Sequence, residues 1–353
     1  MTKARRTISG RTAVISGAAS GMGRSLALRL AGHGSPVAIT DIDQRGLKET
    51  AASISGPVLS RVLDVSDADA QLAFAAEVRD WTPTAVGAVF NNAGVNLAST
   101  VLDADPDDDQ WLWNINFHGV VNGTRAFLPI LVEQDAGAIV NTSSVFGLAG
   151  IPGQSAYCAA KFAVRGFTDA LRQELRGTGV SAINVHPGGV NTNIVRNARL
   201  RTGPQGNGPT HQQMVAEFAA TTMTTPDKAA EVIHRGVEAG KSRILIGLDA
   251  HLFDILARLA PTRYLDIIER FQAPIDWARR AGTVAASDST SRPSTRGRRA
   301  PIAEAAVAFE QCTQAQNGRL VEPLRDELDA DRQLLRAVPV RHRECRQASQ
   351  IER

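Results

Sequence analysis

Tyr157 and Lys161 have the residue types and the spacing that a proton transfer needs. The chain has 2 tyrosines, and Tyr157 stands four residues ahead of Lys161 in the stretch "SAYCAAK". Residues at this spacing lie on one face of a helix, so the ammonium can sit beside the phenol. An unperturbed phenol has a pKa of about 10 and is a poor base at neutral pH, but a neighbouring cation favours the phenolate. The pair is therefore a candidate acid–base site, although an ordinary exposed pair has the same spacing.

A hydroxyl group stands close to this pair in the chain. Ser144 precedes Tyr157 and follows the apolar run "GAIVNTS". A hydroxyl placed after a strand can hold an oxygen on which negative charge develops during a reaction. A strand-end cap is the alternative role, and the neighbouring Ser143 competes for the same assignment.

The elements that must position these residues follow a regular alternation from Thr12 to about Gly247. Seven runs have the β-branched composition of buried strands: 12–16, 36–40, 57–63, 86–90, 137–143, 180–185 and 243–247. Longer segments with apolar residues at helical spacing separate them. This alternation predicts an α/β fold, a doubly wound parallel β-sheet (Rossmann fold) with helices on both faces. Ligands of such sheets bind at the carboxyl ends of the strands.

The composition divides the chain into one domain and an extension. We expect residues 8–275 to form the Rossmann-type domain. Residues 276–353 are expected to form a poorly ordered C-terminal extension, because the chain becomes polar and rich in arginine there. Within the domain, the long polar segment 191–225 predicts a lid or a tolerated surface insertion. The stretch 251–271 has the apolar stripes of two amphipathic helices, which could cover a substrate, join subunits or rest on a membrane surface.

Composition argues against several other classes of protein. The net charge is +3 and no basic stripe is interleaved with aromatic residues, so no nucleic-acid partner is expected. The histidines show no pair at metal-ligand spacing, so no metal is expected. Cys158, Cys312 and Cys345 are too widely spaced to indicate a disulfide framework. With neither a signal peptide nor a transmembrane run in the sequence, we expect a cytoplasmic protein.

A glycine-rich turn follows the first predicted strand in "VISGAASGMGRSLA". Gly17, Gly21 and Gly23 let backbone N–H groups approach a pyrophosphate at the positive end of the next helix. Asp41 ends the second predicted strand, where its carboxylate can accept hydrogen bonds from an adenosine ribose and would repel a 2′-phosphate. A helix N-cap or an ordinary loop acid is the alternative role for Asp41. The pattern predicts NAD, with NADP less favoured because of the repulsion but left open by the nearby Arg45.

The glycine spacing G-x-x-x-G-x-G and four later motifs together resemble the short-chain dehydrogenase/reductase family. The motifs are "NNAG" at 91–94, "NINFHG" at 114–119, "NTSSVFG" with "YCAAK" at 141–161, and "HPGGVNT" at 186–192. The resemblance covers about residues 8–250. It implies cofactor contacts from Gly17, Ser20, Gly21, Met22, Gly23, Asp41, Asp64, Val65, Asn92, Ala93, Gly94, Tyr157, Lys161, Pro187, Gly188, Val190 and Thr192. Asp64 and Val65 resemble the pair beside the adenine, and Pro187 and Gly188 the turn under the nicotinamide.

The resemblance also implies a catalytic set of Asn116, Ser144, Tyr157 and Lys161. In this set Tyr157 is the general acid/base, Lys161 also binds the nicotinamide ribose, and Ser144 holds the substrate oxygen. Asn116 resembles the asparagine that perturbs the following helix and holds a water in a proton relay to the lysine; Asn114 competes for this assignment.

We therefore expect an NAD-dependent oxidoreductase that interconverts a secondary alcohol and a ketone. The alternatives are an NADP-dependent carbonyl reductase of the same family and a non-catalytic nucleotide-sensing or scaffold protein. Four residues that follow the catalytic strand predict a rather apolar substrate, unless they belong to the core: Val145, Phe146, Leu148 and Ile151. Family members are commonly dimers or tetramers packed through the helices that contain 106–132 and 155–178, so we expect a homodimer or homotetramer.

Overall fold

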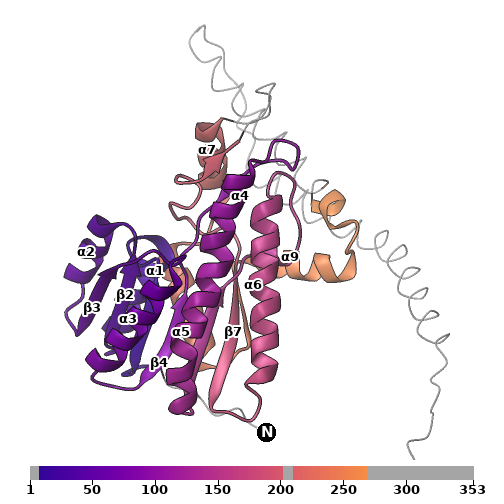
Figure 1. The fold of residues 1–353 in the computed structure, drawn as a ribbon. Helices are drawn as coiled ribbons and strands as arrows, with labels where there is room; N and C mark the ends of the chain where they lie inside the picture. Colours follow the sequence, from indigo (N-terminus) through magenta and orange to yellow (C-terminus); the bar gives the residue numbers. More distant parts are fainter. Residues whose placement is uncertain (1–7, 202–209, 269, 271–353) are drawn as a thin grey trace, which may run out of the picture. The chain divides into compact units, whose positions relative to one another are not determined.

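The computed structural model describes residues 8–201, 210–268 and 270 (Figure 1). The predicted extension, residues 276–353, lies outside the described residues, so that part of the domain prediction stays a prediction.

Seven strands form one parallel sheet. They are β1 (Thr12–Ser16), β2 (Val37–Asp41), β3 (Val58–Val62), β4 (Val86–Asn91), β6 (Gly137–Thr142), β7 (Val180–Pro187) and β9 (Arg243–Ile246). Their order across the sheet is β3-β2-β1-β4-β6-β7-β9, and every neighbouring pair is parallel. The predicted doubly wound sheet is confirmed, and each predicted run is one of its strands. The order reverses between β1 and β4, which is the point where open α/β sheets bind their ligands.

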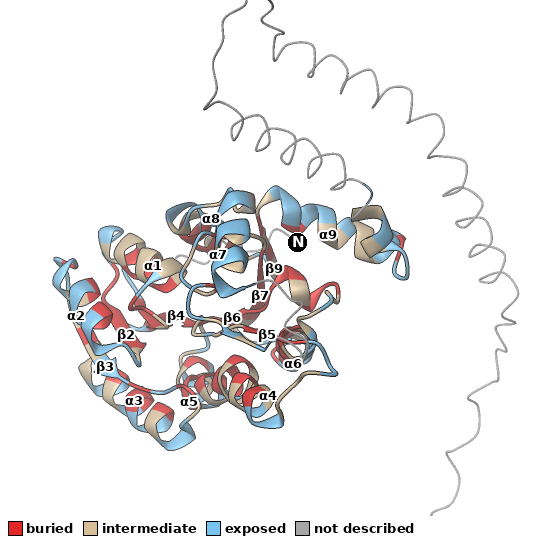
Figure 2. Ribbon diagram, turned by 90° about the horizontal axis from the view of Figure 1, so that it is seen from above, coloured by how far each residue is buried: buried red, intermediate tan, exposed pale blue. Residues whose placement is uncertain are grey.

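Helices cover both faces of this sheet (Figure 2). One face carries α1 (Gly21–Gly32), α2 (Gln44–Ala52) and α8 (Pro226–Glu238), and the other carries α3 (Ala68–Trp81), α5 (Gly119–Glu133) and α6 (Ser155–Glu174). Successive strand side chains point to opposite faces. Val14 of β1 therefore belongs to the core under α3 and α5, while the adjacent Ile15 belongs to the core under α1 and α8.

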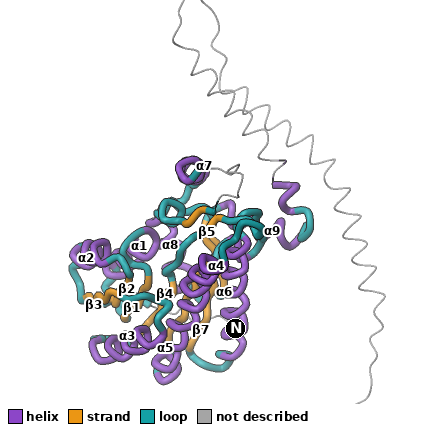
Figure 3. Tube along the Cα trace, turned by 45° about the horizontal axis from the view of Figure 1, so that its top comes forward, coloured by secondary structure: helices purple, strands orange, loops and turns teal. Residues whose placement is uncertain are grey.

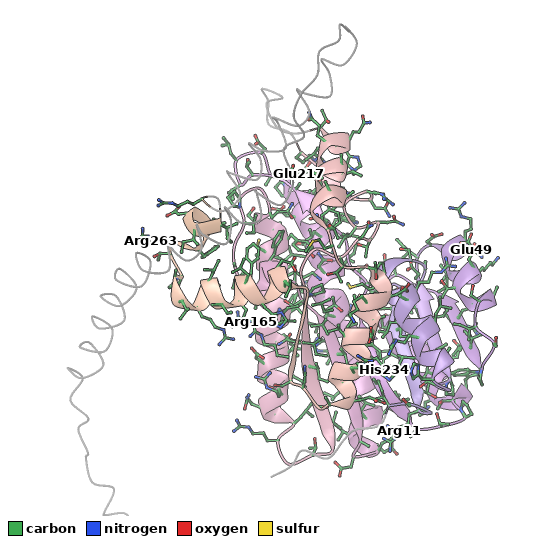
Figure 4. The ribbon with its side chains drawn as sticks, turned by 180° about the vertical axis from the view of Figure 1, so that it is seen from behind. Arg11, Glu49, Arg165, Glu217, His234 and Arg263 are labelled. Carbon is green, nitrogen blue, oxygen red and sulfur yellow. The ribbon has the colours of Figure 1, made fainter. Side chains whose placement is uncertain are left out.

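A polar contact joins the two helices α1 and α8 behind the sheet. The Arg29 Nε donates a hydrogen bond to Nδ1 of His234 at 3.2 Å, and Figure 4 shows His234 on α8 from this side. This contact ties the last turn of α1 to α8.

Segment 191–225 is more regular than the sequence predicted. It contains β8 (Arg199–Leu200), which pairs in parallel with β5 (Leu97–Ala98), and α7 (His211–Thr221). The start of α7 is a capping box in which the Thr210 hydroxyl accepts from the backbone N–H of Gln213 and the Gln213 side chain accepts from that of Thr210. The T-x-x-Q spacing was a readable signal for this helix.

The two-stranded sheet of β5 and β8 lies beside α4 (Pro106–Trp113), a helix that flanks the predicted site. Helix α4 contacts β5, as Figure 3 also shows. The predicted helical stretch 251–271 begins earlier than expected, as α9 (Leu248–Leu259), and residues 264–268 form a further helical turn after Pro261. Within the described part of the chain, none of the helices combines the length and apolarity needed to cross a membrane.

Candidate active site

The glycine turn between β1 and α1 has a backbone that requires glycine at several positions. Gly17 and Gly21 have φ values of +69° and +53°, which residues with a Cβ rarely adopt. A Cβ added to Gly17 would lie 2.8 Å from Cα of Ala93, and one added to Gly23 would collide with the carbonyl oxygen of Gly17. The turn therefore exposes backbone without side chains at these glycines, and we call residues 17–23 the glycine cradle.

The first turn of α1 faces this cradle. Ser20, its N-cap residue, makes no side-chain cap among the described residues, and the first turn carries no acidic side chain. Met22 lies partly buried against the core below. Unpaired N–H groups and the positive end of the helix dipole suit a phosphate at this position. The residues present thus fit the pyrophosphate of a dinucleotide.

The "NNAG" segment runs along the back of the cradle. The Ser16 hydroxyl accepts from the backbone N–H groups of Asn92 and Ala93, both at 3.1 Å, and the Asn92 amide donates to the Ser16 carbonyl at 3.1 Å. At the far end, a Cβ added to Gly94 would lie 3.6 Å from Nζ of Lys161. The segment therefore connects the glycine turn to the predicted catalytic residues.

Asp41 lies at the rim of the cradle. Its Oδ2 accepts from the backbone N–H of Ala19 at 2.9 Å, and its Oδ1 accepts from that of Asp43 at 3.0 Å. The N-cap of α2 is Asp43, whose carboxylate accepts from the backbone of Arg45 and Gly46. The N-cap alternative for Asp41 is therefore wrong, and its carboxylate is fixed beside the turn that would meet a ribose.

The predicted adenine pair follows β3. The exposed Asp64 carboxylate accepts hydrogen bonds from the backbone N–H and hydroxyl of Ser66 at 2.9 and 2.8 Å. Val65 is buried, and a Cβ on Gly119 of α5 would collide with its side chain at 2.7 Å. Both residues lie at the carboxyl edge of the sheet, on the β2–β3 side of the cradle.

The "HPGGVNT" segment returns from β7 to the glycine turn. Pro187 ends β7, and the Gly188 N–H donates to the carbonyl of Ile246 at 2.9 Å. Val190 is buried, and Thr192 reaches the glycine turn, where a Cβ on Gly21 would lie 3.1 Å from Thr192 Cγ2. Gly21 and Thr192, which are far apart in the sequence, are therefore neighbours in the structure.

Asn116 lies in a π-helical turn, Asn114–His118, between α4 and α5. Such turns are rare and are frequent at functional sites. The fully buried Asn116 amide pairs with Val95, accepting from its N–H and donating to its carbonyl, both at 2.9 Å. The Asn114 side chain instead accepts from Gln110 at the exposed side of the helix. Of the two, Asn116 faces the predicted site.

Tyr157 and Lys161 are both buried in the first half of α6. Their exposed fractions are 8% and 3%, so the alternative of an ordinary exposed pair is wrong. Lys161 Nζ lies 5.6 Å from the centre of the Tyr157 ring and donates to the Thr142 carbonyl at 3.0 Å. The alternation of the chain brings α6 directly against the carboxyl end of β6, which places both side chains at the ligand-binding edge.

Ser144 and Ser143 are separated by their hydrogen bonds. The Ser144 hydroxyl lowers the pKa of the Tyr157 phenol, against the larger raising effect of burial, and it accepts from the backbone N–H of Phe146 at 3.1 Å. The Ser143 hydroxyl donates to the Lys161 carbonyl at 2.8 Å. Ser144 therefore accompanies the phenol, and Ser143 braces the helix behind it.

Burial dominates the electrostatics of this pair. It raises the pKa of Tyr157 to about 12, against the lowering effect of Ser144, and it lowers the pKa of Lys161 to about 8. The expectation from sequence, that Lys161 and the positive charge of an oxidised nicotinamide together favour the phenolate, did not include this desolvation. In the structure described here the phenol is neutral at physiological pH, and any added positive charge acts on it through a low-dielectric environment.

Apolar side chains surround the phenol. Leu97 of β5 and Leu112 of α4 belong to the same buried cluster as Tyr157 and Ala160, and Phe146 meets the Tyr157 ring edge-on at 6.1 Å. Of the four predicted pocket residues, Val145 and Leu148 are buried, whereas Phe146 and Ile151 are partly exposed.

Two neighbours of the site are buried and electrically neutral. Cys158 accepts from the Ile151 N–H at 3.4 Å, and burial raises the pKa of its thiol. His186 contacts the Ser144 carbonyl through Nδ1 at 3.0 Å, and burial lowers its pKa to about 4. Both are packed residues. Within the residues described, no cluster of metal-ligating side chains is present.

One residue beside the site escaped the sequence analysis. The Asp249 carboxylate, in the first turn of α9, accepts from the Gly189 N–H at 2.6 Å. A Cβ on Gly188 would collide with the same carboxylate. The contact joins residues 60 positions apart, so no local motif could have predicted it.

The fold and the site define a Rossmann-type oxidoreductase with a backbone cradle for a dinucleotide and a buried tyrosine–lysine pair. Residues 11–202 match the family model described as short chain dehydrogenase, and the chain belongs to the short-chain dehydrogenase/reductase family. The sequence prediction of this family is confirmed.

Known members show the same relationship. The chain is 42% identical to the SadH protein of Mycobacterium tuberculosis over 266 residues, which are 73% of this chain and 94% of that protein. A short-chain dehydrogenase/reductase from Burkholderia phymatum in complex with NAD superimposes with a TM-score of 0.64 at 29% identity, covering 74% of this chain and 96% of that one. A serine dehydrogenase complexed with NADP+ has a TM-score of 0.60 at 26% identity, covering 67% and 94%.

Proposed function

We propose that the protein is an NAD-dependent oxidoreductase that interconverts a secondary alcohol and a ketone by hydride transfer, with Tyr157 as general acid/base. The observation that carries this proposal is the buried arrangement of Tyr157, Lys161 and Ser144 at the end of the segment that leads from the glycine cradle. A phenol, an ammonium and a hydroxyl in one dry site are the groups that such a reaction needs.

The residues divide the work of alcohol oxidation between them. The bound nicotinamide supplies the hydride acceptor. The Tyr157 oxygen, as phenolate, takes the proton of the substrate hydroxyl, while the alcohol carbon loses a hydride and its C–O bond becomes the ketone. The Ser144 hydroxyl donates to the substrate oxygen, where charge changes during transfer. Lys161 lies close enough to stabilise the phenolate, and reduction of a ketone runs the same steps in reverse.

Asp41 supports NAD over NADP. A carboxylate already fixed by two backbone N–H groups can accept a ribose hydroxyl without moving, and it would repel a 2′-phosphate. The solved relatives include complexes of both NAD and NADP+, so an NADP-dependent carbonyl reductase is the second candidate. The presence of all four predicted catalytic side chains argues against a non-catalytic scaffold.

The proposed substrate is small to medium in size and rather apolar. Leu97, Leu112 and Phe146 lie around Tyr157, and such side chains favour an apolar substrate body.

We also propose a homodimer or homotetramer in the cytoplasm. Val132 of α5 and Phe162 of α6 are 46% and 40% exposed, on the two helices through which family members are expected to pair. Apolar side chains exposed on these helices suit a subunit contact.

The function can be tested by incubating the protein with NAD and a panel of secondary alcohols and measuring the absorbance of the reduced nicotinamide that forms. Tyr157→Phe removes the proton acceptor and should lower kcat by at least about a hundredfold, while the Kd for NAD stays within about twofold. Tyr264→Phe is the matched control, since that hydroxyl donates to the Gly150 carbonyl at 2.7 Å and has no proposed part in the chemistry. Equal losses in the two variants, or turnover by Tyr157→Phe at the wild-type rate, would contradict the mechanism.

A further inference from the structure

We infer that Asp108 is a positioning residue for this site. Its carboxylate, held between Arg199 and Arg201, fastens the segment after β7 to α4 and thereby fixes the apolar wall around Tyr157. The inference rests on the proposed function for its catalytic consequence, but the fastening itself stands on contacts that do not depend on activity.

The three side chains form what we call the Asp108 clamp. Asp108 Oδ1 lies 2.6 Å from Nη1 of Arg199, and Oδ2 lies 2.5 Å from Nε of Arg201. The Arg199 guanidinium also stacks on the Trp111 ring, 3.7 Å from its centre. Arg201 makes a further ion pair with Asp105 at 3.2 Å. The clamp thus joins the first turns of α4 to Arg199, which begins β8, and to Arg201, which follows it, 91 and 93 positions from Asp108.

The buried position of Asp108 makes this contact different from a surface ion pair. Its side chain is 5% exposed, whereas the two arginines are nearly half exposed. A buried carboxylate needs charged or hydrogen-bonding partners, and removing one member of a buried ion pair leaves the charge of the other member unpaired. The hydrogen bond from Arg201 is the largest of the effects that lower the pKa of Asp108, so the carboxylate is ionised at neutral pH.

The charges of the clamp cancel one another. Two guanidinium groups face the carboxylates of Asp108 and Asp105. Exposed arginines near a substrate site invite the interpretation that they bind an anionic substrate, but Nη1 of Arg199 and both Nε and Nη2 of Arg201 are directed at carboxylates within the protein. Positioning is therefore the role that the geometry supports.

Backbone hydrogen bonds connect the clamp to the helix that carries Tyr157. The N–H of Arg199 donates to the Asn96 carbonyl at 3.1 Å, and that of Arg201 to the Ala98 carbonyl at 2.9 Å. The next residue, Ser99, donates to the Gly153 carbonyl at 2.9 Å and bridges Gln154, directly ahead of α6. The path from the clamp to the start of α6 is continuous.

Apolar contacts lead to the same place. Leu97 of β5 and Leu112 of α4 are almost fully buried in the cluster that contains Tyr157. These two side chains come from the two elements that the clamp holds together: α4 carries Asp108, and β5 pairs with β8. If the clamp opened, both sides of the wall around the phenol would lose their common support.

Hydrogen exchange followed by mass spectrometry tests the fastening without any substrate. In Asp108→Asn, amides in residues 97–101 and 153–158 should exchange at least about fivefold faster, because their local opening becomes easier, while residues 12–25 of the cofactor cradle should not change. The control Asp107→Asn removes an exposed carboxylate from the same turn of α4 and should leave all three segments unchanged. Unaltered exchange at 97–101 and 153–158, or a uniform increase across the domain, would overturn the inference.

Steady-state kinetics tests the catalytic consequence on an alcohol that the wild-type protein oxidises. Asp108→Asn should lower kcat by about ten- to a hundredfold, as expected for a misplaced site, with the Kd for NAD within about twofold of wild type. In an Arg199→Gln/Arg201→Gln background the same Asp108→Asn change should add less than about twofold, because its partners are already absent. A parallel loss of NAD affinity, or additive losses, would refute positioning. If the wild-type protein oxidises no alcohol, the proposed function fails, and the exchange result alone decides the fastening.

Discussion

Replacing Asp41 by serine should reverse the cofactor preference. The wild-type carboxylate is fixed at the rim of the glycine turn by the backbone N–H groups of Ala19 and Asp43. Serine removes the charge and leaves space for a 2′-phosphate. We expect Asp41→Ser to bind NADP more tightly and NAD less tightly than the wild-type protein.

The size of both effects follows from the environment of the carboxylate. Two unit charges 4 Å apart interact with about 4 kcal/mol at the effective dielectric of a protein surface and with about 1 kcal/mol in bulk water. Asp41 is partly exposed, so the gain in NADP affinity should lie between about fivefold and several hundredfold, near the lower end at physiological salt. Loss of a hydrogen bond between the ribose and a charged acceptor corresponds to about 1.5–3 kcal/mol, or about ten- to a hundredfold weaker NAD binding.

Isothermal titration with each cofactor measures both constants directly and does not require a known substrate. Asp43→Ser is the matched control, because it removes a charge two residues away while serine can still cap α2. This control should change the ratio of the two Kd values by less than about twofold. If wild type already binds NADP more tightly than NAD, or if Asp41→Ser leaves the ratio unchanged, the role given to Asp41 is refuted.

Three further predictions concern Lys161, His186 and Asp249, which lie at or beside the site. Burial lowers the pKa of Lys161 from 10.5 to about 8, so the unfolded chain binds more protons than the folded one between these pH values. The free energy of unfolding should therefore rise from pH 8 to pH 10. Urea melts of Lys161→Met should lack this rise, and an equal rise in the variant would contradict the prediction. Burial lowers the pKa of His186 from 6.5 to about 4, so the free energy of unfolding should fall as the pH falls from 6.5 to 4, and His186→Asn should reduce this loss in the same melts. Asp249→Ala leaves the Gly189 N–H without its acceptor and should weaken NAD binding by about three- to tenfold in isothermal titration. Asp249→Asn keeps an acceptor oxygen and should recover most of that affinity. Equal effects of the two substitutions would argue against the contact.

Much of the fold could be predicted because its signals are local. The run "TAVIS" has the composition of a strand buried on both faces, and the structure places Val14 and Ile15 in the two opposite cores. The glycine turn is equally local, since the positive φ of Gly17 and Gly21 can be expected from the residue type and spacing. Helix α7 had a readable capping box at Thr210, although the glycines and proline before it led to the prediction of an irregular segment.

The contacts that support the candidate site are not local and left no pattern in the sequence. Asp108 meets Arg199 and Arg201 only because β8 pairs with β5, and neither two-residue strand is long enough to carry a periodic signal. Asp249 meets Gly189 through the parallel pairing of β7 with β9. In each case the partner is selected by the topology of the sheet, which the spacing of residues in one segment does not encode.

Burial also decides how the tyrosine–lysine pair works. With a pKa of about 12 for Tyr157 and about 8 for Lys161, the phenol holds its proton more strongly than the ammonium does. The pair alone is therefore not poised for proton removal from an alcohol. A positive charge bound beside Gly94 would favour the phenolate, and the low dielectric that opposes ionisation in its absence would enlarge that effect. In the proposed reaction, the desolvation that keeps the phenol neutral without cofactor would make its basicity depend on an occupied cofactor site, so that proton removal would require the hydride acceptor to be present.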